Sequence, residues 1–276
     1  MNGAYGQRML EIARRAGLDA RELAIPETEP VRAEHVTEVP SAKADVDAVG
    51  VVHCETTTGL LNPLAEVTAA IKAAGRLAVV DAVSSFGGVP MDLSGLGIDI
   101  MAGSANKCLQ GVPGLAFVIT RRGLLQPRPA VSPSLTLDLY DQWQEMERSP
   151  GKWRFTSPTH AVAALHEALC ELVEEGGVAA RAGRYRSSGE LLVEGMVARG
   201  FVPLIAGEWR SDVVTTFLPP VPAFDVPAFY EGLKQAGYLI CPGKTATVES
   251  FRIGSIGAIG PEVIGGFLDA VSGLMV

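Results

Sequence analysis

The sequence predicts an α/β fold: a mainly parallel, doubly wound sheet followed by a smaller α+β region. Two observations carry this prediction. Short β-branched runs alternate with helical patterns through the first part of the chain, as successive βαβ units require. From about residue 200 the pattern changes to short strands, a proline-rich turn and two further helices. We therefore expect a large domain over residues 1–180 and a small C-terminal domain over residues 181–276.

The helical patterns in the first half of the chain have clear start and stop signals. Residues 7–16 carry apolar side chains at helical spacing and end at Gly17. Residues 63–74 follow Asn62 as a cap, begin with a proline at the first helical position, and end at Gly75. The strands expected around these helices are residues 48–53, 77–80, 99–102 and 115–120.

The second half of the chain supplies longer helices before the change in pattern. We expect a helix from residue 158 to about 175 and another over residues 184–199. The elements predicted after that point are strands at 201–205 and 213–217, a helix near 228–236, and a terminal helix after Pro261.

Composition excludes several functional classes. The 276 residues are 47% hydrophobic and 20% charged, which suits a soluble globular protein with a sizeable core. A net charge of −8 leaves no basic face for nucleic acid or an anionic membrane. No apolar run is long enough to cross a bilayer, and the four cysteines lack the spacing of a disulfide framework or a metal site. We therefore expect a cytoplasmic protein without a bound metal.

Polar residues gather where three predicted strands end. The segment HCETTTG follows the strand at residues 48–53, Asp81 ends an apolar run, and Lys107 lies in the small-residue segment GSANKCLQGVPG. Ligands of open α/β sheets bind outside the carboxyl ends of the strands, so these segments are candidate binding loops. The threonines are also ordinary turn residues, Asp81 is also a plausible cap, and most lysines lie on solvated surfaces.

The pairing of Asp81 with Lys107 suggests a specific chemistry. Pyridoxal 5′-phosphate needs an anion beside its ring nitrogen and an amine for its aldehyde. A lysine among small residues and glycines is also a candidate nucleophile or base, since burial lowers the pKa of an amine. The sequence therefore indicates a transaminase-like site at this edge of the sheet.

Five motifs carry a family resemblance over nearly the whole chain. The stretches HCETTTGLLNPL, VVDAVSSFGG, SANKCLQGVPG, RFTSPTH and FRIGSIG together resemble the 2-aminoethylphosphonate–pyruvate transaminases, a branch of the class V aminotransferases. The resemblance implies a fold-type I architecture, pyridoxal 5′-phosphate as cofactor, and 2-aminoethylphosphonate and pyruvate as substrates. The order of Asp, Lys and a late Arg is shared with alanine–glyoxylate and serine–pyruvate aminotransferases, which remain alternatives.

The resemblance also assigns roles in cofactor binding. Lys107 is similar to the lysine that binds the cofactor covalently and shuttles the substrate proton, and Asp81 is similar to the aspartate that keeps the pyridine nitrogen protonated. Thr56 or Thr57 resembles the hydroxyl residue near the phenolic oxygen of the ring. Asn106 holds the position before the lysine, from which the side chain can reach the phosphate.

Two further residues complete the implied site. Thr156 resembles a threonine that contacts the cofactor phosphate of the neighbouring subunit, which implies a homodimer. Arg252 resembles the arginine that binds the substrate's acid group, and a guanidinium suits a carboxylate or phosphonate.

The resemblance starts at the stretch NGAYGQR, which begins at Asn2. We therefore expect the chain to lack the family's N-terminal segment, roughly a quarter of its length, with a loop that holds the cofactor phosphate at a helix N-terminus. A non-catalytic, truncated remnant of the fold is the second alternative.

Overall fold

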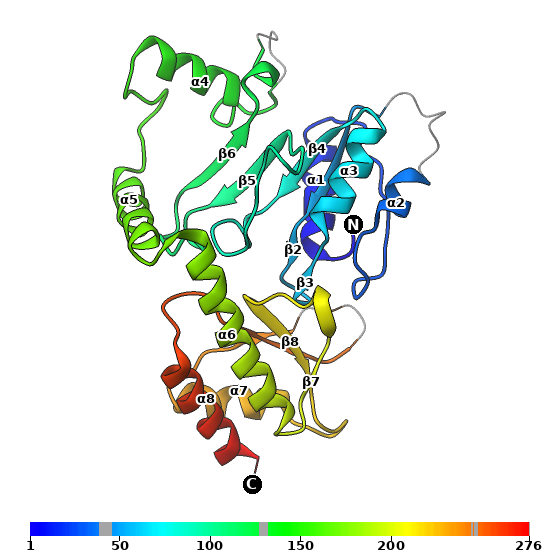
Figure 1. The fold of residues 1–276 in the computed structure, drawn as a ribbon, viewed down its shortest axis with the longest axis vertical. Coiled ribbons are helices and arrows are strands. Elements are labelled where there is room, and N and C mark those ends of the chain that lie inside the picture. Colours follow the sequence, from blue (N-terminus) through cyan, green and yellow to red (C-terminus); the bar gives the residue numbers. More distant parts are fainter. Residues whose placement is uncertain (39–45, 127–131, 244, 246–247, 276) are drawn as a thin grey trace.

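Two four-stranded sheets organise the chain, and the long helix α6 (Gly177–Val197) leads from the first to the second (Figure 1). The computed structural model describes residues 1–38, 46–126, 132–243, 245 and 248–275. The first sheet and its helices form the upper part of Figure 1, and the second sheet with the C-terminal helices forms the lower part. The division expected at residues 180 and 181 falls inside α6 and stays a prediction.

The first sheet has the strand order β1-β4-β5-β6. Its strands are β1 (Ala48–Val52), β4 (Leu77–Asp81), β5 (Ile100–Ser104) and β6 (Ala116–Thr120). The first three are parallel, as the sequence predicts, and β6 runs antiparallel to β5. The reversal follows from the connection of residues 105–115, which is too short for the crossover that parallel strands require.

Three helices and a small hairpin complete this part of the chain. They are α1 (Ala4–Arg15), α2 (Ala33–Thr37), the hairpin β2 (Cys54–Glu55) with β3 (Leu60–Leu61), and α3 (Leu64–Ala73). The core between α3 and the sheet is built from aliphatic residues, including Val67, Ile71 and Val80, none of which is exposed. Helix α2 and the hairpin were not predicted, because two to five residues are too few for a periodic pattern.

The second sheet is antiparallel throughout, in the order β7-β8-β10-β9. Its elements, with the helices that cover it, are β7 (Val202–Pro203), β8 (Val214–Leu218), α7 (Val226–Gln235), β9 (Cys241–Pro242), β10 (Phe251–Gly254) and α8 (Pro261–Leu274). Phe201, Phe217, Phe229 and Phe251 form one aromatic cluster in its core, with ring centroids 5.3–6.1 Å apart. The strand predicted over 201–205 is shorter than expected, since β7 covers only Val202 and Pro203, although Leu204 N still donates to Thr216 O of β8 at 2.8 Å.

Helices α4 (Leu139–Arg148) and α5 (Thr159–Glu174) lie beside the first sheet, and two short 3₁₀ turns occur at Arg122–Leu124 and Gly207–Trp209. Helix α4 was not predicted. Helix α6 begins at Gly177, seven residues before its predicted start at 184, so the two long helices are separated only by a turn at Glu175 and Gly176. Across the described ranges, no helix combines the length and the apolar character needed to cross a membrane.

Candidate active site

The carboxyl ends of β1, β4 and β5 lie side by side. Val52 pairs with Asp81, and Asp81 pairs in turn with Ala102. The backbone continues this contact past the strand ends, since His53 N donates to Asp81 O at 2.8 Å and Ala82 N donates to Ala102 O at 3.0 Å. The three segments that carry the candidate residues therefore share one edge of the first sheet.

Two glycines allow the Asp81 segment to pack directly on the Lys107 segment. A Cβ at Gly88 would lie 2.6 Å from Cys108 Sγ, and a Cβ at Gly87, where φ is 87°, would lie 2.4 Å from a methyl carbon of Leu109. Cys108 Sγ also donates to Ser84 O at 3.2 Å. Residues larger than glycine would push the two segments apart.

Asp81 and Lys107 both lie close enough to the thiol of Cys54 to influence its pKa. Burial is the main reason that the pKa of Cys54 is raised to about 12; the hydrogen bond with Ser211 and the charge of Lys107 lower the pKa, and the carboxylates of Glu55 and Asp81 raise it. Both candidate side chains are half-buried. Within the described residues, the Lys107 amine has no hydrogen bond or ion pair.

The Asp81 carboxyl is shaped by its surroundings. Its Oδ1 accepts from Val83 N at 2.9 Å. Burial raises the pKa of this carboxyl, while the bond from Val83 and the charge of Arg8 lower it and limit the rise. A half-buried carboxylate of this kind is stabilised by a cationic partner.

The HCETTTG segment is arranged around Glu55, whose side chain is fully buried. Glu55 Oε2 accepts from Tyr5 N at 3.0 Å, at the start of α1, and Oε1 accepts from Thr57 N at 3.2 Å and Thr57 Oγ1 at 2.6 Å. The Thr57 hydroxyl is therefore committed to Glu55, whereas Thr56 is half-buried. Sequence reasoning missed Glu55, although a carboxylate among hydroxyls directly after a buried strand is an available signal.

Arg252 reaches this segment from the second sheet. On β10 it pairs with Thr216 of β8, and its Nη1 donates to Thr56 O at 3.1 Å. Thr216 Oγ1 donates to Thr57 O at 3.1 Å, so both strands hold the same turn. The Nη2 of Arg252 donates to Pro242 O at 3.2 Å, and its Nε is buried without a partner in the described structure. The guanidinium therefore keeps donor capacity for a ligand.

The structure places the remaining two candidates differently. Asn106 is half-buried in the same turn as Lys107, and its Oδ1 accepts from Ser104 Oγ at 2.5 Å. Thr156 is exposed on the connection between α4 and α5, and this connection lies at the left-hand edge of the molecule in Figure 1. Within the described residues, no hydrogen bond joins Thr156 to the turn that carries Lys107.

His53 is a buried neighbour of the site. It is 5% exposed, its Nδ1 lies 2.8 Å from Ser85 Oγ, and burial lowers its pKa to about 4. These features fit the structural role that its position at a strand end indicates.

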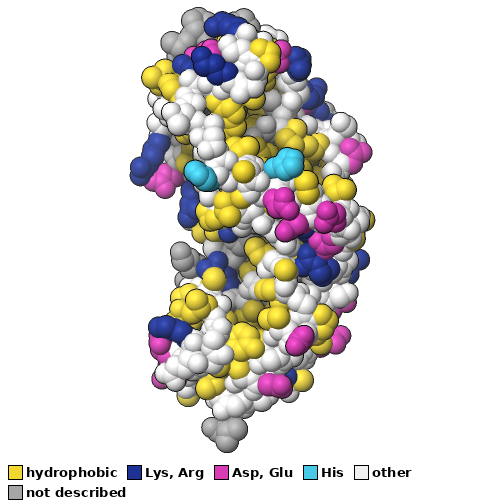
Figure 2. Space-filling view, turned by 90° about the vertical axis from the view of Figure 1, so that its left-hand side faces the viewer, with side chains coloured by type: hydrophobic (Ala, Val, Ile, Leu, Met, Phe, Trp, Pro, Cys, Tyr) yellow, Lys and Arg dark blue, Asp and Glu magenta, His cyan; other side chains and the backbone are white. Residues whose placement is uncertain are grey.

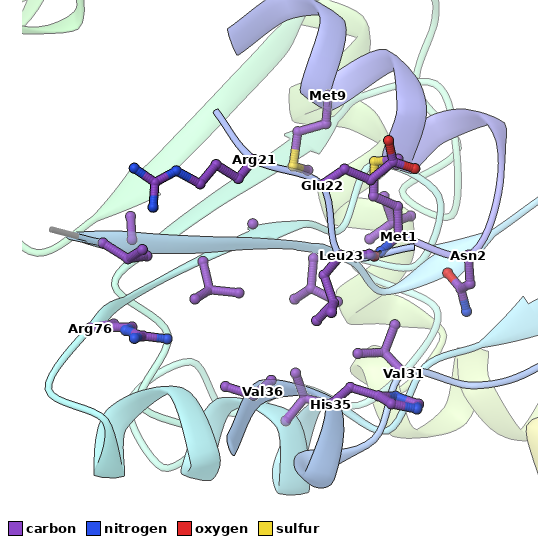
Figure 3. Close-up of a pocket in the computed structure, with 18 of the residues that line it drawn as sticks. Met1, Asn2, Met9, Arg21, Glu22, Leu23, Val31, His35, Val36 and Arg76 are labelled. Carbon is purple, nitrogen blue, oxygen red and sulfur yellow. Dashed lines mark hydrogen bonds between the residues drawn. The ribbon is translucent and has the colours of Figure 1, made fainter. Parts of the chain in front are cut away.

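A cavity of about 440 Å³ lies elsewhere, beside β1 and among α1, α2 and α3 (Figure 3). Its lining is largely apolar and includes Met9, Val36 and Leu23, with Arg76 at one end. None of the candidate residues lines it, so this cavity is separate from the site at the strand ends.

Known proteins with similar sequences or folds agree with this architecture. The family described as aminotransferase class-V matches residues 7–233. A 2-aminoethylphosphonate–pyruvate transaminase from Bacteroides fragilis is 52% identical over 261 residues, which are 95% of this chain and 72% of that protein. A transaminase of the same name from Vibrio cholerae is 47% identical over 98% of this chain and 74% of its own length.

Solved structures support the fold class. A pyridoxamine–pyruvate aminotransferase from Mesorhizobium loti superposes with a TM-score of 0.89 at 25% identity, over 99% of this chain and 71% of the other. An alanine–glyoxylate aminotransferase from Nostoc sp. gives the same TM-score and identity, over 100% of this chain and 74% of the other. The predicted fold class is confirmed, and the chain belongs to the class V aminotransferase family.

Proposed function

We propose that this chain transfers the amino group of 2-aminoethylphosphonate to pyruvate with pyridoxal 5′-phosphate, yielding phosphonoacetaldehyde and L-alanine. The observation that carries the proposal is the difference in identity between relatives. Transaminases named for this reaction are 47–52% identical over 95–98% of the chain, whereas the alanine–glyoxylate aminotransferase is 25% identical. We therefore prefer this donor to alanine or serine.

The residues at the strand ends fit the reactive groups of pyridoxal phosphate. Lys107 offers an amine that no described residue pairs with, and Asp81 offers a half-buried carboxyl without an ion-pair partner in the described structure. An amine suits the aldehyde and a carboxylate suits the protonated ring nitrogen. When bound, the cofactor supplies an electron sink for the bond that is broken at the amine-bearing carbon of the substrate.

Each residue would then have a defined task. Asp81 would hold positive charge at the ring nitrogen. Lys107 Nζ would take the proton from the amine-bearing carbon of the donor as general base and pass it to the former aldehyde carbon of the cofactor, and with pyruvate it would move a proton in the opposite direction, to the carbon that becomes the amine-bearing carbon of alanine. Arg252 binds the phosphonate of the donor or the carboxylate of pyruvate, using the donors that Thr56 and Pro242 leave free. The two small acidic substrates, 2-aminoethylphosphonate and pyruvate, would therefore bind in turn at the same place, each with its acid group at Arg252 and its reacting carbon at Lys107.

The other candidate residues would hold the cofactor itself. Of the two threonines, Thr56 suits a contact with the ring better, because the Thr57 hydroxyl already donates to Glu55. Asn106 adjoins Lys107 and suits a contact with the phosphate.

Thr156 suits a contact with the phosphate of a partner subunit, and a homodimer would cover the flank on which it lies. The elements next to Thr156 in the chain carry exposed apolar residues: Leu135 (70% exposed) and Leu137 (77%) precede α4, and Val173 (75%) lies on α5. Figure 2 shows hydrophobic side chains over the same face. The oligomeric state can be measured by analytical ultracentrifugation.

A cytoplasmic location is supported by the cysteines. All four are free thiols, and Cys54 and Cys108 are buried. Free thiols are typical of a reducing compartment.

Borohydride trapping tests the proposed function. Protein incubated with pyridoxal phosphate and reduced with borohydride should carry the cofactor on Lys107, as located by peptide mass spectrometry. Lys107→Ala should abolish the adduct, and Lys234→Ala, which removes an exposed lysine paired with Glu231, should leave it intact.

A separate assay tests the donor. The rate of alanine formation from pyruvate should be higher with 2-aminoethylphosphonate than with serine as amino donor. If no lysine is labelled at saturating cofactor, the non-catalytic alternative holds instead.

A further inference from the structure

Helix α6 holds the turn that follows Lys107 through two fully buried side chains. Arg181 is 1% exposed, and its Nη1 donates to Cys108 O at 3.1 Å and to Leu109 O at 3.2 Å. The Tyr185 hydroxyl, on a residue that is not exposed, also donates to Cys108 O, at 3.3 Å. The two carbonyls directly after the reactive lysine are therefore both fixed by the same helix.

The Tyr185 hydroxyl also connects this turn to the segment behind Arg252. It accepts from Gln110 Nε2 at 2.6 Å and from Gly257 N at 3.4 Å. A tyrosine hydroxyl has one hydrogen to donate and two lone pairs, so these contacts use its full capacity. One oxygen atom therefore joins the Lys107 turn to the segment that follows β10.

Glu175 completes the arrangement at the end of α5. Its carboxylate accepts from Arg181 Nε at 2.8 Å and from Arg184 Nε at 2.7 Å, and Arg184 Nη1 donates to Gly257 O at 2.5 Å. The hydrogen bond from Arg184, followed by that from Arg181, lowers the pKa of Glu175 despite its partial burial. The carboxylate balances the charge of buried Arg181, which would otherwise be costly. We call Glu175, Arg181, Arg184 and Tyr185 the α6 clamp.

Gln110 shows that the clamp holds a strained conformation. Its φ is 65°, in the left-handed region, and it is the one residue other than glycine with positive φ in the described structure. Its backbone N donates to Lys107 O at 2.8 Å, and its side chain ends on Tyr185. Strain of this kind persists where surrounding contacts impose it, and it concentrates at functional sites.

We propose that Tyr185, with Arg181, is a positioning residue for transamination: it sets the Lys107 amine relative to the Arg252 guanidinium by tying both segments to α6. The proposal rests on the proposed function, in which a substrate is held at its acid end by Arg252 while Lys107 moves a proton at the amine-bearing carbon. An error of about 1 Å between reacting groups can cost up to about 100-fold in rate. A link between the two segments therefore acts on the chemical step.

The first test uses Tyr185→Phe, which keeps the ring and removes only the hydroxyl. In the protein without cofactor or substrate, hydrogen exchange measured by mass spectrometry should speed up in both segments, 108–111 and 255–259. Gln110→Gly, which leaves the hydroxyl in place, should speed up exchange in 108–111 alone. Tyr230→Phe, at a partly buried tyrosine of the second core, is the matched control and should change neither. Unchanged exchange at 255–259 in Tyr185→Phe would overturn the proposed link.

The second test separates positioning from a purely structural role. In Tyr185→Phe, kcat for alanine formation should fall about tenfold while KM for pyruvate changes less than about threefold, because Arg252 still binds the acid group. An unchanged kcat, or a loss confined to KM, contradicts the proposal. A wild-type chain that shows the described exchange but forms no alanine contradicts the proposed function and leaves the link between the two segments standing.

Discussion

Arg252 donates from Nη1 to the backbone oxygen of Thr56 at 3.1 Å, although 196 residues separate the two in the chain. This bond crosses from the second sheet to the loop after β1, so the candidate site exists only when both sheets are folded together. The buried Nε of Arg252 has no partner among the described residues, which leaves the guanidinium a donor for an acidic ligand.

Arg252→Lys should weaken the binding of pyruvate. A lysine amine cannot form the paired hydrogen bonds of a guanidinium with a carboxylate, and it also loses the contacts with Thr56 and Pro242. We expect KM for pyruvate to rise at least about tenfold with a smaller change in kcat, measured by steady-state kinetics. Arg15→Lys, at an exposed arginine of α1 paired with Glu11, is the control and should leave KM unchanged. An unchanged KM in Arg252→Lys would remove Arg252 from the substrate site.

Asp81→Asn should abolish most of the activity without unfolding the protein. The amide keeps the size of the side chain and still accepts from Val83 N through its oxygen, but it carries no negative charge. Loss of a charge that acts at the reacting ring should reduce kcat by about 100-fold or more. The assay is alanine formation, with circular dichroism to check the fold. Activity within a factor of about two of the wild type would exclude the assigned role.

His53 should make the protein sensitive to mild acid. Its pKa is lowered to about 4 in the folded state from about 6.5, so the unfolded chain binds a proton that the folded chain excludes. The stabilisation is complete above pH 6.5 and is lost as the pH falls toward 4. Between pH 7 and pH 5, His53 alone should remove about 2 kcal/mol from the free energy of unfolding.

Urea unfolding at the two pH values measures this loss. In His53→Asn the loss between pH 7 and pH 5 should be smaller by that amount, whereas His160→Asn, at an exposed histidine, should behave as the wild type does. Equal pH dependence in wild type and His53→Asn would show that burial does not hold His53 neutral.

Long elements with a periodic pattern could be predicted from the sequence. The ends of the predicted strands then indicated Asp81 and Lys107 as candidate site residues. The three parallel strands and helices α3 and α5 lie within two residues of the expected bounds, and α8 begins within one residue of its expected start, because β-branched runs and the proline and glycine signals at helix ends are local. The hairpin of β2 and β3 could not be predicted in this way, since it is held by distant contacts such as Ser211 N to Gly59 O at 2.8 Å. Antiparallel β6 depends on the length of a connection, which periodicity does not encode.

The α6 clamp was missed for a related reason. A charged residue such as Arg181 is expected on the solvent-exposed surface, because arginines are seldom fully buried. It is buried here because the carbonyls of Cys108 and Leu109 and the carboxylate of Glu175 accept its hydrogen bonds. One local signal existed: Arg181 and Tyr185 begin a stripe at helical spacing that continues through Leu192 and Met196, all of them buried. An arginine within the buried row of a helix needs a buried hydrogen-bond acceptor, and only the tertiary structure shows which groups serve as that acceptor.

Gly88→Ala should destabilise the contact between the Asp81 and Lys107 segments, whereas Gly183→Ala should stabilise the chain. The added Cβ at Gly88 would lie 2.6 Å from Cys108 Sγ and 2.8 Å from a ring carbon of Tyr185, so a buried thiol and a buried ring must move. Overpacking of this kind lowers the free energy of unfolding by about 1–3 kcal/mol.

Gly183 is the contrasting position, because it is exposed in the middle of α6 with nothing within 4 Å of an added Cβ. Alanine there should raise the free energy of unfolding by about 0.5–1 kcal/mol. Urea unfolding of both variants measures the opposite signs. A neutral Gly88→Ala would show that Cys108 and Tyr185 can shift freely, which is incompatible with a fixed Lys107 turn.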